Sequence, residues 1–313
     1  MKIHFFGVRG SLPTPLQSVQ IQSKIVAVVS QIREKDIRTE DDRQRFIAGL
    51  PDYLYGTVGG NTACIELTLD DGETVLLDAG TGIRLCGKKY NSVKNPVFHL
   101  FMTHFHWDHI QGLPFFDPLY KKDSVFHIYS ANSDAKKIFS DQMQAPHLFP
   151  VSMEAATKNI FYHTLQEGSP IVVGNATVYC KKMFHPGASH AFLFTENGKR
   201  FIYATDTELQ KNDFERTKEN VDFFDNADVL VLDSQYTVED AVEKENWGHS
   251  TFCYAVDFAH KFNIKQLYLF HHEPTYDDKK LFSILKSAQW YSDNICNGQI
   301  AVHLAVEGRE IIL

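Results

Sequence analysis

The chain has 313 residues, of which 43% are hydrophobic and 22% charged, and its formal net charge is −8. This composition is typical of a globular protein with enough chain to bury a core. The acidic balance argues against broad electrostatic capture of nucleic acid. No stretch approaches the roughly 18 apolar residues of a membrane span, and the apolar run at the N-terminus is too short for a signal peptide. Five scattered cysteines without a CxxC pair indicate reduced thiols. We therefore expect a cytoplasmic protein with no membrane partner.

The N-terminal part of the chain combines a short strand with a helical segment. Residues 2–6 are predicted to form a strand that runs into the turn 7–15. Residues 18–50 change character, because Val19, Val26 and Val29 follow near-helical spacing with polar residues between them. We interpret 18–50 as a helical insertion within one domain that covers 1–313. A packed surface excursion, a lid over the site and a dimer surface all fit this pattern.

Strand patterns resume after the insertion. Residues 61–69 and 73–82 are separated by the turn signal DDG and predict a hairpin. Residues 96–104 form the continuous apolar run of a buried strand. Further strands are predicted at 124–131, 170–183, 190–206, 227–234, 264–272 and 299–313, and helices at 134–144, 250–262 and 279–291. The result is an α/β fold whose ionisable residues gather where strands end, as sites do in open α/β sheets.

The segment THFHWDH, residues 103–109, carries the strongest chemical signal. His104 and His106 alternate at a strand end, so their side chains leave on one face. Asp108 and His109 lie on the following turn, within reach of a second centre. Imidazole and carboxylate suit zinc, manganese or iron, and the lack of thiolates argues against a closed structural zinc site. Because burying so many polar groups without a partner is costly, this cluster predicts a metal site.

The HxHxDH pattern at 104–109, preceded by the Asp-ending strand LLDAGTG, resembles the signature of the metallo-β-lactamase superfamily. Six further segments resemble that superfamily in the same order: HFFGVRGSLPTP, GGNTACIEL, FHPGASHAFLF, YATDTE, WGHST and LFHHEP. The resemblance implies an α/β fold of the four-layer αβ/βα type, with a two-metal site along one edge of the sheets.

The same resemblance implies a ligand set. His104, His106 and His185 would hold one ion, Asp108, His109 and His271 the other, and Asp206 would bridge both. His190 competes with His185, and His272 competes with His271. Asp78 resembles an acidic residue that orients the histidine motif without binding metal. Two divalent ions, zinc foremost and manganese or iron as alternatives, would make a bridging hydroxide suited to hydrolysis of an ester, lactone, thioester or phosphodiester.

A later element narrows the reaction. The segment WGHST resembles one carried by ribonuclease Z and related phosphodiesterases, which implies His249 as a catalytic residue beside Asp108, with Ser250 next to it. The strand DVLVLDSQY then supplies Asp233 as the acidic partner of His249. A carboxylate that fixes one imidazole nitrogen leaves the other to protonate a leaving oxygen. The alternative is that Ser250 caps the helix at 250–262 and His249 only packs.

Two residues near the N-terminal glycine loop each have two possible roles. Arg9 offers a planar fork that suits a phosphate, and it could equally anchor its loop through an ion pair. Asn61, in the segment GGNT, either hydrogen-bonds the loop or contacts the substrate.

The spacing between His185 and Asp206 bears on the substrate. Only about twenty residues separate them, and they read as a plain hairpin without the long arm of tRNA-processing relatives. The chain therefore resembles the arm-less, cyclic phosphodiesterase-like branch, departing from it in the insertion 18–50, which would roof the site. We expect hydrolysis of a small phosphodiester or cyclic nucleotide phosphate, and no large RNA. The alternatives are a lactonase or thioesterase, or a non-catalytic metal-bound sensor. Since dimers are common in the superfamily, a homodimer is one expected assembly.

Overall fold

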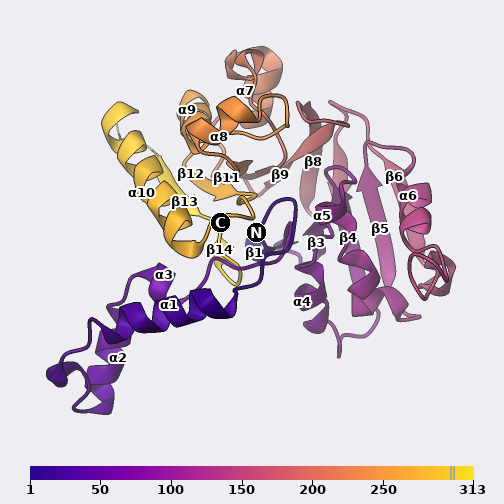
Figure 1. Cartoon of the computed structure of the whole chain (residues 1–313). Helices are drawn as coiled ribbons and strands as arrows, with labels where there is room; N and C mark the ends of the chain where they lie inside the picture. The colour runs from indigo at the N-terminus through magenta and orange to yellow at the C-terminus, as the bar shows by residue number, and fades with distance from the viewer. Residues whose placement is uncertain (297, 299) are drawn as a thin grey trace.

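The computed structural model describes residues 1–296, 298 and 300–313. Two seven-stranded sheets stack face to face, and helices cover their outer faces, so the expected four-layer αβ/βα sandwich is confirmed (Figure 1). The strand order is β14-β1-β2-β3-β4-β5-β6 in the first sheet and β13-β12-β11-β10-β9-β8-β7 in the second. In each sheet, the run of parallel strands (β3 to β6 and β10 to β13) brings carboxyl ends to a common edge.

The strands of the first sheet are β1 (Lys2–Gly7), β2 (Cys64–Thr68), β3 (Thr74–Leu77), β4 (Val97–Met102), β5 (Val125–Ser130), β6 (Ile160–Thr164) and β14 (Glu310–Ile312). Those of the second are β7 (Ile171–Val173), β8 (Ala176–Met183), β9 (Ser189–Glu196), β10 (Lys199–Ala204), β11 (Val229–Asp233), β12 (Gln266–Phe270) and β13 (Ala301–Leu304).

The α-helices are α1 (Ser18–Val29), α2 (Glu40–Ala48), α3 (Asp52–Tyr55), α4 (Ile83–Lys88), α5 (Trp107–Ile110), α6 (Ala135–Gln142), α7 (Lys218–Phe224), α8 (Val238–Glu243), α9 (Phe252–Lys261) and α10 (Asp278–Ile295). Short 3₁₀ turns cover Glu34–Asp36, Leu113–Phe115, Asp117–Tyr120, Met153–Ala155 and Lys211–Phe214. Among the described residues, none of the helices combines the length and apolar character that a membrane crossing requires.

Two apolar cores hold β3 and β4 in place. Between the sheets, the Phe101 ring of β4 lies 5.3 Å, centroid to centroid, from both Phe192 and Phe194 of β9. On the other face of β4, Phe98 packs against Phe126 of β5 in the core beneath the outer helices. Burial of each such ring stabilises the fold by about 1.5–3 kcal/mol. The polar segment that follows β4 therefore starts from a rigid strand end.

Two strand predictions needed correction. The edge strand β6 was missed, because its sequence lacks the alternation of apolar and polar residues that marks a half-buried strand. The segment predicted as one strand at 170–183 is two, β7 and β8, which form a hairpin at Gly174. Gly174 takes a φ of +53°, the left-handed conformation that glycine adopts at little cost.

The insertion forms a helical arm, defined here as α1 to α3. Its helical character is confirmed and continues to Tyr55, beyond residue 50. None of the three helices buries a residue, and α1 leaves Val19, Ile25 and Val26 exposed. Figure 1 shows the arm projecting beside α10 and away from α5. The expectation that the insertion roofs the site is therefore wrong, since the arm extends away from the sheet edge where the candidate ligands lie.

Candidate metal centre

Seven candidate ligands meet at the carboxyl ends of the central strands. They form two groups whose ligand atoms lie within 4.8 Å of one another: His104, His106 and His185 in the first, and Asp108, His109, Asp206 and His271 in the second. The strands β4, β8, β10 and β12 end just before members of these groups. Every metal ligand expected from the sequence thus lies in one of the two groups.

Asp206 joins the groups through its two oxygens. Its Oδ2 lies 3.6 Å from His104 Nε2 and 3.8 Å from His185 Nε2, on the side of the first group. Its Oδ1 lies 3.1 Å from His109 Nε2 and 3.2 Å from His271 Nε2, on the side of the second. One carboxylate therefore faces both groups, as a bridging ligand must.

The imidazoles are oriented by contacts on their far side. His109 Nδ1 lies 2.9 Å from Asp78 Oδ2, His185 Nδ1 lies 3.0 Å from the Gly248 carbonyl, and His271 Nδ1 lies 3.0 Å from Gln235 Oε1. Because Nδ1–H donates to each of these oxygens, Nε2 keeps its lone pair and faces the group.

Buried histidine nitrogens without hydrogen-bond partners indicate whether a metal ion fits this cluster. His104 Nε2 and His109 Nε2 are buried, and neither has a well-aligned hydrogen-bond partner among the described residues. A buried polar atom without a partner costs about 1–3 kcal/mol. His106 Nδ1 and His185 Nε2 lie 3.1 Å apart, close enough for both nitrogens to bind one metal ion. The set of imidazole and carboxylate donors therefore fits divalent metal ions such as zinc.

The charge states also suit metal binding. Burial lowers the pKa of His104 well below its ordinary value and also lowers the pKa of His106 and His185, so that the first group presents neutral imidazoles. Burial opposes ionisation of Asp108 and Asp206, but the adjacent His109 and His271 hold both carboxyl pKa values below their usual range. The surrounding carboxylates in turn raise the pKa of His109 and of His271 despite their burial, so a metal ion that binds the second group would displace protons from these two imidazoles.

Asp78 lies outside both ligand groups and positions one of them. Besides His109, it accepts hydrogen bonds from the Thr103 backbone N–H and the Tyr203 hydroxyl, each at 2.9 Å. Asp78 thus contacts His109 on the side away from the ligand group, and its orienting role stays a prediction. Tyr203 and Gln235 were not identified from the sequence. Gln235 follows Asp233 by two residues at the same strand end, which is a signal that could have suggested it, whereas Tyr203 reads as an ordinary strand aromatic.

His249 and Asp233 pair beside the cluster. His249 Nδ1 lies 2.7 Å from Asp233 Oδ2, and the His249 ring stacks on His271 with centroids 4.9 Å apart. His249 also offers a nitrogen within 4.8 Å of ligand atoms of His185 and Asp206. The structure therefore brings this pair to the junction of the two groups.

Ser250 does not cap the following helix. Thr251 is the N-cap of α9, and its side chain accepts the Tyr254 N–H. Ser250 instead donates its hydroxyl to the Thr207 carbonyl at 2.6 Å and accepts the Leu209 N–H at 3.0 Å. Its side chain thus ties the His249 segment to the loop that carries Asp206, and the capping interpretation is wrong.

Arg9 and Asn61 hold loops together. Arg9 is buried and donates to the carbonyls of Gly59, Glu273 and Tyr276 at 2.8–3.1 Å. Its Nε and Nη1 donors are engaged by the chain itself, which favours the loop-anchoring interpretation, and the anchors are carbonyls rather than the expected ion pair. Asn61 Nδ2 donates to Glu307 Oε2 at 3.0 Å, which fits the loop interpretation.

The competing histidines lie elsewhere. His272 Nε2 lies 2.9 Å from the Ala305 carbonyl, and burial lowers its pKa to about 3. The backbone N–H of His190 donates to the Thr103 carbonyl at 3.1 Å, and His190 belongs to neither ligand group.

Three residues of the site hold positive φ angles: Asp78 at 59°, Asp206 at 53° and His271 at 62°. A non-glycine residue in this region costs of order 1–3 kcal/mol and tends to occur at functional sites. Gly10 explains another close approach, since a Cβ atom there would lie 2.5 Å from His271 Nδ1.

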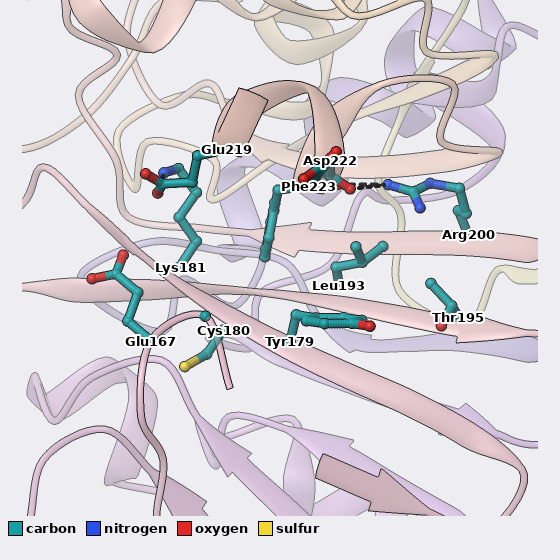
Figure 2. Close-up of a pocket in the computed structure, with 11 residues that line it drawn as sticks. Glu167, Tyr179, Cys180, Lys181, Leu193, Thr195, Arg200, Glu219, Asp222 and Phe223 are labelled. Atoms are coloured by element: carbon teal, nitrogen blue, oxygen red, sulfur yellow. Dashed lines mark hydrogen bonds and ion pairs between the residues drawn. The ribbon is translucent and has the colours of Figure 1, made fainter. Parts of the chain in front are cut away.

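A cavity larger than the one beside the metal cluster lies elsewhere in the fold. A cavity of about 870 Å³ lies between the outer face of β8–β10 and α7. Figure 2 shows Lys181 beside Glu219 in this cavity and Arg200 reaching the Asp222 carbonyl. Its lining includes no member of the metal cluster. A smaller cavity of about 330 Å³ is lined by His104 and His106 themselves.

Comparisons with known proteins agree with this geometry. The ribonuclease Z of Prochlorococcus marinus (strain MIT 9301) is 23% identical over 291 residues, covering 73% of this chain and 89% of that protein. Human tRNase Z, short form, superposes with a TM-score of 0.61 at 18% identity over 100% of this chain and 99% of its own. A diphosphatase from the PhnP family gives a TM-score of 0.62 at 16% identity over 100% and 97%.

The protein family described as "Beta-lactamase superfamily domain" matches residues 73–272 of this chain. This range is well over half of the chain and includes every candidate metal ligand. The expected metallo-β-lactamase fold and the histidine motif are found together in this region. The chain belongs to the beta-lactamase superfamily.

Proposed function

We propose that this protein is a divalent-metal-dependent phosphodiesterase that hydrolyses a small phosphodiester or cyclic phosphate. The observation that carries the proposal is the His249–Asp233 pair at 2.7 Å, located beside both ligand groups. A hydrolase whose leaving group departs as an alkoxide benefits from such a proton donor.

The metal ligands are His104, His106, His185, Asp206, Asp108, His109 and His271, and zinc is the expected ion, with manganese or iron as alternatives. Two divalent ions bound there would activate water and offset the negative charge that develops on the phosphoryl oxygens. Asp78 and Gln235 keep His109 and His271 in the tautomer that ligation requires.

His249 is the proton donor in this proposal. Asp233 is fully buried, and its Oδ1 accepts the Ser250 N–H at 3.0 Å, so the carboxylate that holds His249 Nδ1 is itself fixed. Because Asp233 engages Nδ1 of His249, Nε2 is the ring nitrogen left to deliver a proton to a departing oxygen. Hydrolysis of a lactone or thioester depends less on such a proton donor.

The substrate is proposed to be small because the β9–β10 connection is a tight turn at Asn197 and Gly198, without an arm that could hold a large RNA. The net charge of −8 also disfavours a polyanion. The similarity to ribonuclease Z keeps RNA processing as the second candidate.

A substrate panel tests the proposal. Purified protein loaded with zinc, manganese or iron would be assayed on bis(p-nitrophenyl) phosphate, a cyclic nucleotide, a homoserine lactone, a glutathione thioester and a precursor tRNA. We expect turnover of the diesters. Preference for the lactone or thioester overturns the proposal, preference for the tRNA supports the second candidate, and ligand binding without turnover of any substrate indicates a sensor.

A further inference from the structure

Two of the three tryptophans are exposed next to the metal cluster. Trp107 is 83% exposed and Trp247 is 61% exposed. An indole offers a large apolar surface that folding normally buries. Neither ring belongs to the two buried apolar cores of the described residues. Because Trp290 is also 61% exposed, what sets Trp107 and Trp247 apart is their place in the chain beside the ligand residues.

Both tryptophans lie close in the chain to residues that form or contact the His106–His185 pair. Trp107 directly follows His106, and Trp247 directly precedes Gly248, whose carbonyl accepts from His185 Nδ1 at 3.0 Å. The ring nitrogens of His106 and His185 are only 3.1 Å apart. The two exposed indoles thus belong to residues that directly adjoin, in the chain, a member of the first ligand group or a residue bonded to one.

Local structure keeps both side chains outside. In α5, residues 108–110 are buried and Trp107 alone is exposed. Trp247 closes a turn through its N–H to the Lys244 carbonyl at 3.1 Å, and the buried Gly248 follows it. Each tryptophan is consequently held at its backbone while its ring stays available.

A cavity lies on the same side of the cluster. It measures about 330 Å³ and is lined by His106, Phe105, Asn132 and His190. This volume is at the lower end of the range for small-molecule sites. A substituent on a phosphate bound at the cluster has room to extend beside the first ligand group, although neither tryptophan belongs to the lining of this cavity.

We propose that Trp107 and Trp247 provide a stacking surface for a planar aromatic substituent, so that the preferred diester carries a nucleobase or a comparable ring. This inference rests on the proposed phosphodiesterase function. Stacking suits exposed indoles because every nucleobase presents a π-face, and the interaction does not need a preformed set of hydrogen bonds.

A matched pair of substrates tests the inference. Adenosine 2′,3′-cyclic phosphate and methyl β-D-ribofuranoside 2,3-cyclic phosphate share the ribose and the five-membered cyclic diester, and only the first carries a base. For Trp107→Ala and Trp247→Ala, we expect the ratio of kcat/KM between these substrates to fall by roughly 5-fold or more, mainly through KM. Trp107→Phe and Trp247→Phe should restore most of the preference. Trp290, 61% exposed on α10, provides the control Trp290→Phe, which should leave the ratio at its wild-type value.

Binding provides a readout without turnover. In the Trp290→Phe background, excitation selective for tryptophan reports on Trp107 and Trp247 alone, and we expect adenosine to quench their fluorescence in a saturable way. If neither cyclic phosphate is hydrolysed but adenosine quenches, the phosphodiesterase proposal fails while the aromatic site stands. An unchanged kcat/KM ratio in both alanine variants, or no quenching by adenosine, overturns the stacking role.

Discussion

His249 Nδ1 lies 2.7 Å from Oδ2 of Asp233, and 16 residues separate the two in the chain. Asp233 ends β11, and His249 precedes α9 by a few residues, so the contact joins a strand end to a helix start. The same carboxylate accepts the Ser250 N–H. This relationship places a positioned imidazole beside the two groups of candidate metal ligands.

Replacing His249 by alanine should remove the proton donor and spare the metal ligands. We expect a loss of about 10²–10⁴-fold in kcat on bis(p-nitrophenyl) phosphate, the range typical of general acid catalysis. Metal content, measured by inductively coupled plasma mass spectrometry, should stay at the wild-type level. His147→Ala, at an exposed position, is the matched control. Full activity in His249→Ala would remove the assigned role.

Replacing Asp206 by alanine should abolish binding of both metals, because its two oxygens face the two ligand groups. We expect metal content near zero and no measurable hydrolysis. Asp141→Ala removes an exposed carboxylate that pairs with Lys137 in an i,i+4 contact, and it should behave as wild type. Retention of one equivalent of metal by Asp206→Ala would argue against a bridging position.

Asp78→Ala should weaken metal binding without removing a ligand. His109 Nδ1, the Thr103 N–H and the Tyr203 hydroxyl all lose their buried acceptor. We expect about a 10–100-fold loss of metal affinity and a destabilisation of about 3 kcal/mol or more, measured by metal titration and chemical denaturation. Tyr203→Phe deletes one donor and should cost less in both measurements. Equal effects of the two variants would show that orientation of His109 is not the reason.

His99 should make the fold sensitive to mild acid. It contacts Glu73 Oε2 and the Tyr129 hydroxyl, each at 3.2 Å, and stacks on His127. Burial lowers the pKa of His99 in the folded chain below its ordinary value of about 6.5. The unfolded chain therefore takes up this proton first, and the stability present above pH 6.5 is lost as the pH falls below it.

The test is the free energy of unfolding of His99→Gln and wild type between pH 7.5 and 5. The variant should lose less stability than wild type over this range, and His147→Gln should not differ from wild type. Identical slopes for His99→Gln and wild type would contradict the assignment.

The arm provides a test of assembly. Since α1 exposes Ile25 and Val26 and does not cover the cluster, we predict that its apolar face forms the dimer surface that the sequence suggested as an alternative to a lid. We expect a dimer by size-exclusion chromatography with light scattering, and a monomer for the double variant Ile25→Ser, Val26→Ser. Val242→Ser, at an exposed apolar position of α8, is the control. An unchanged mass in the double variant would exclude this surface.

Much of the fold and the ligand set could be predicted from local patterns. The apolar run before His104 marks a strand buried on both faces, and the alternation of His104 and His106 places both side chains on one side of its end. The arm was recognisable because its spacing is helical between two strand-rich regions. These features depend on neighbours in the chain, which is why a pattern of a few residues suffices to predict them.

Roles that depend on distant contacts could not be predicted in this way. Arg9 meets its carbonyl partners across 50 to 267 positions, and Gln235 meets His271 across 36. The choice between His271 and His272 depends on a backbone turn, because the positive φ of His271 sets its direction after β12. The direction in which the arm projects likewise depends on the packing of α3 against α10. The sequence by itself determined which groups could bind metal and which strands carry them. Only the tertiary structure decided which of those groups converge, because convergence depends on the packing of two sheets and on strand-end dihedral angles that no local pattern specifies.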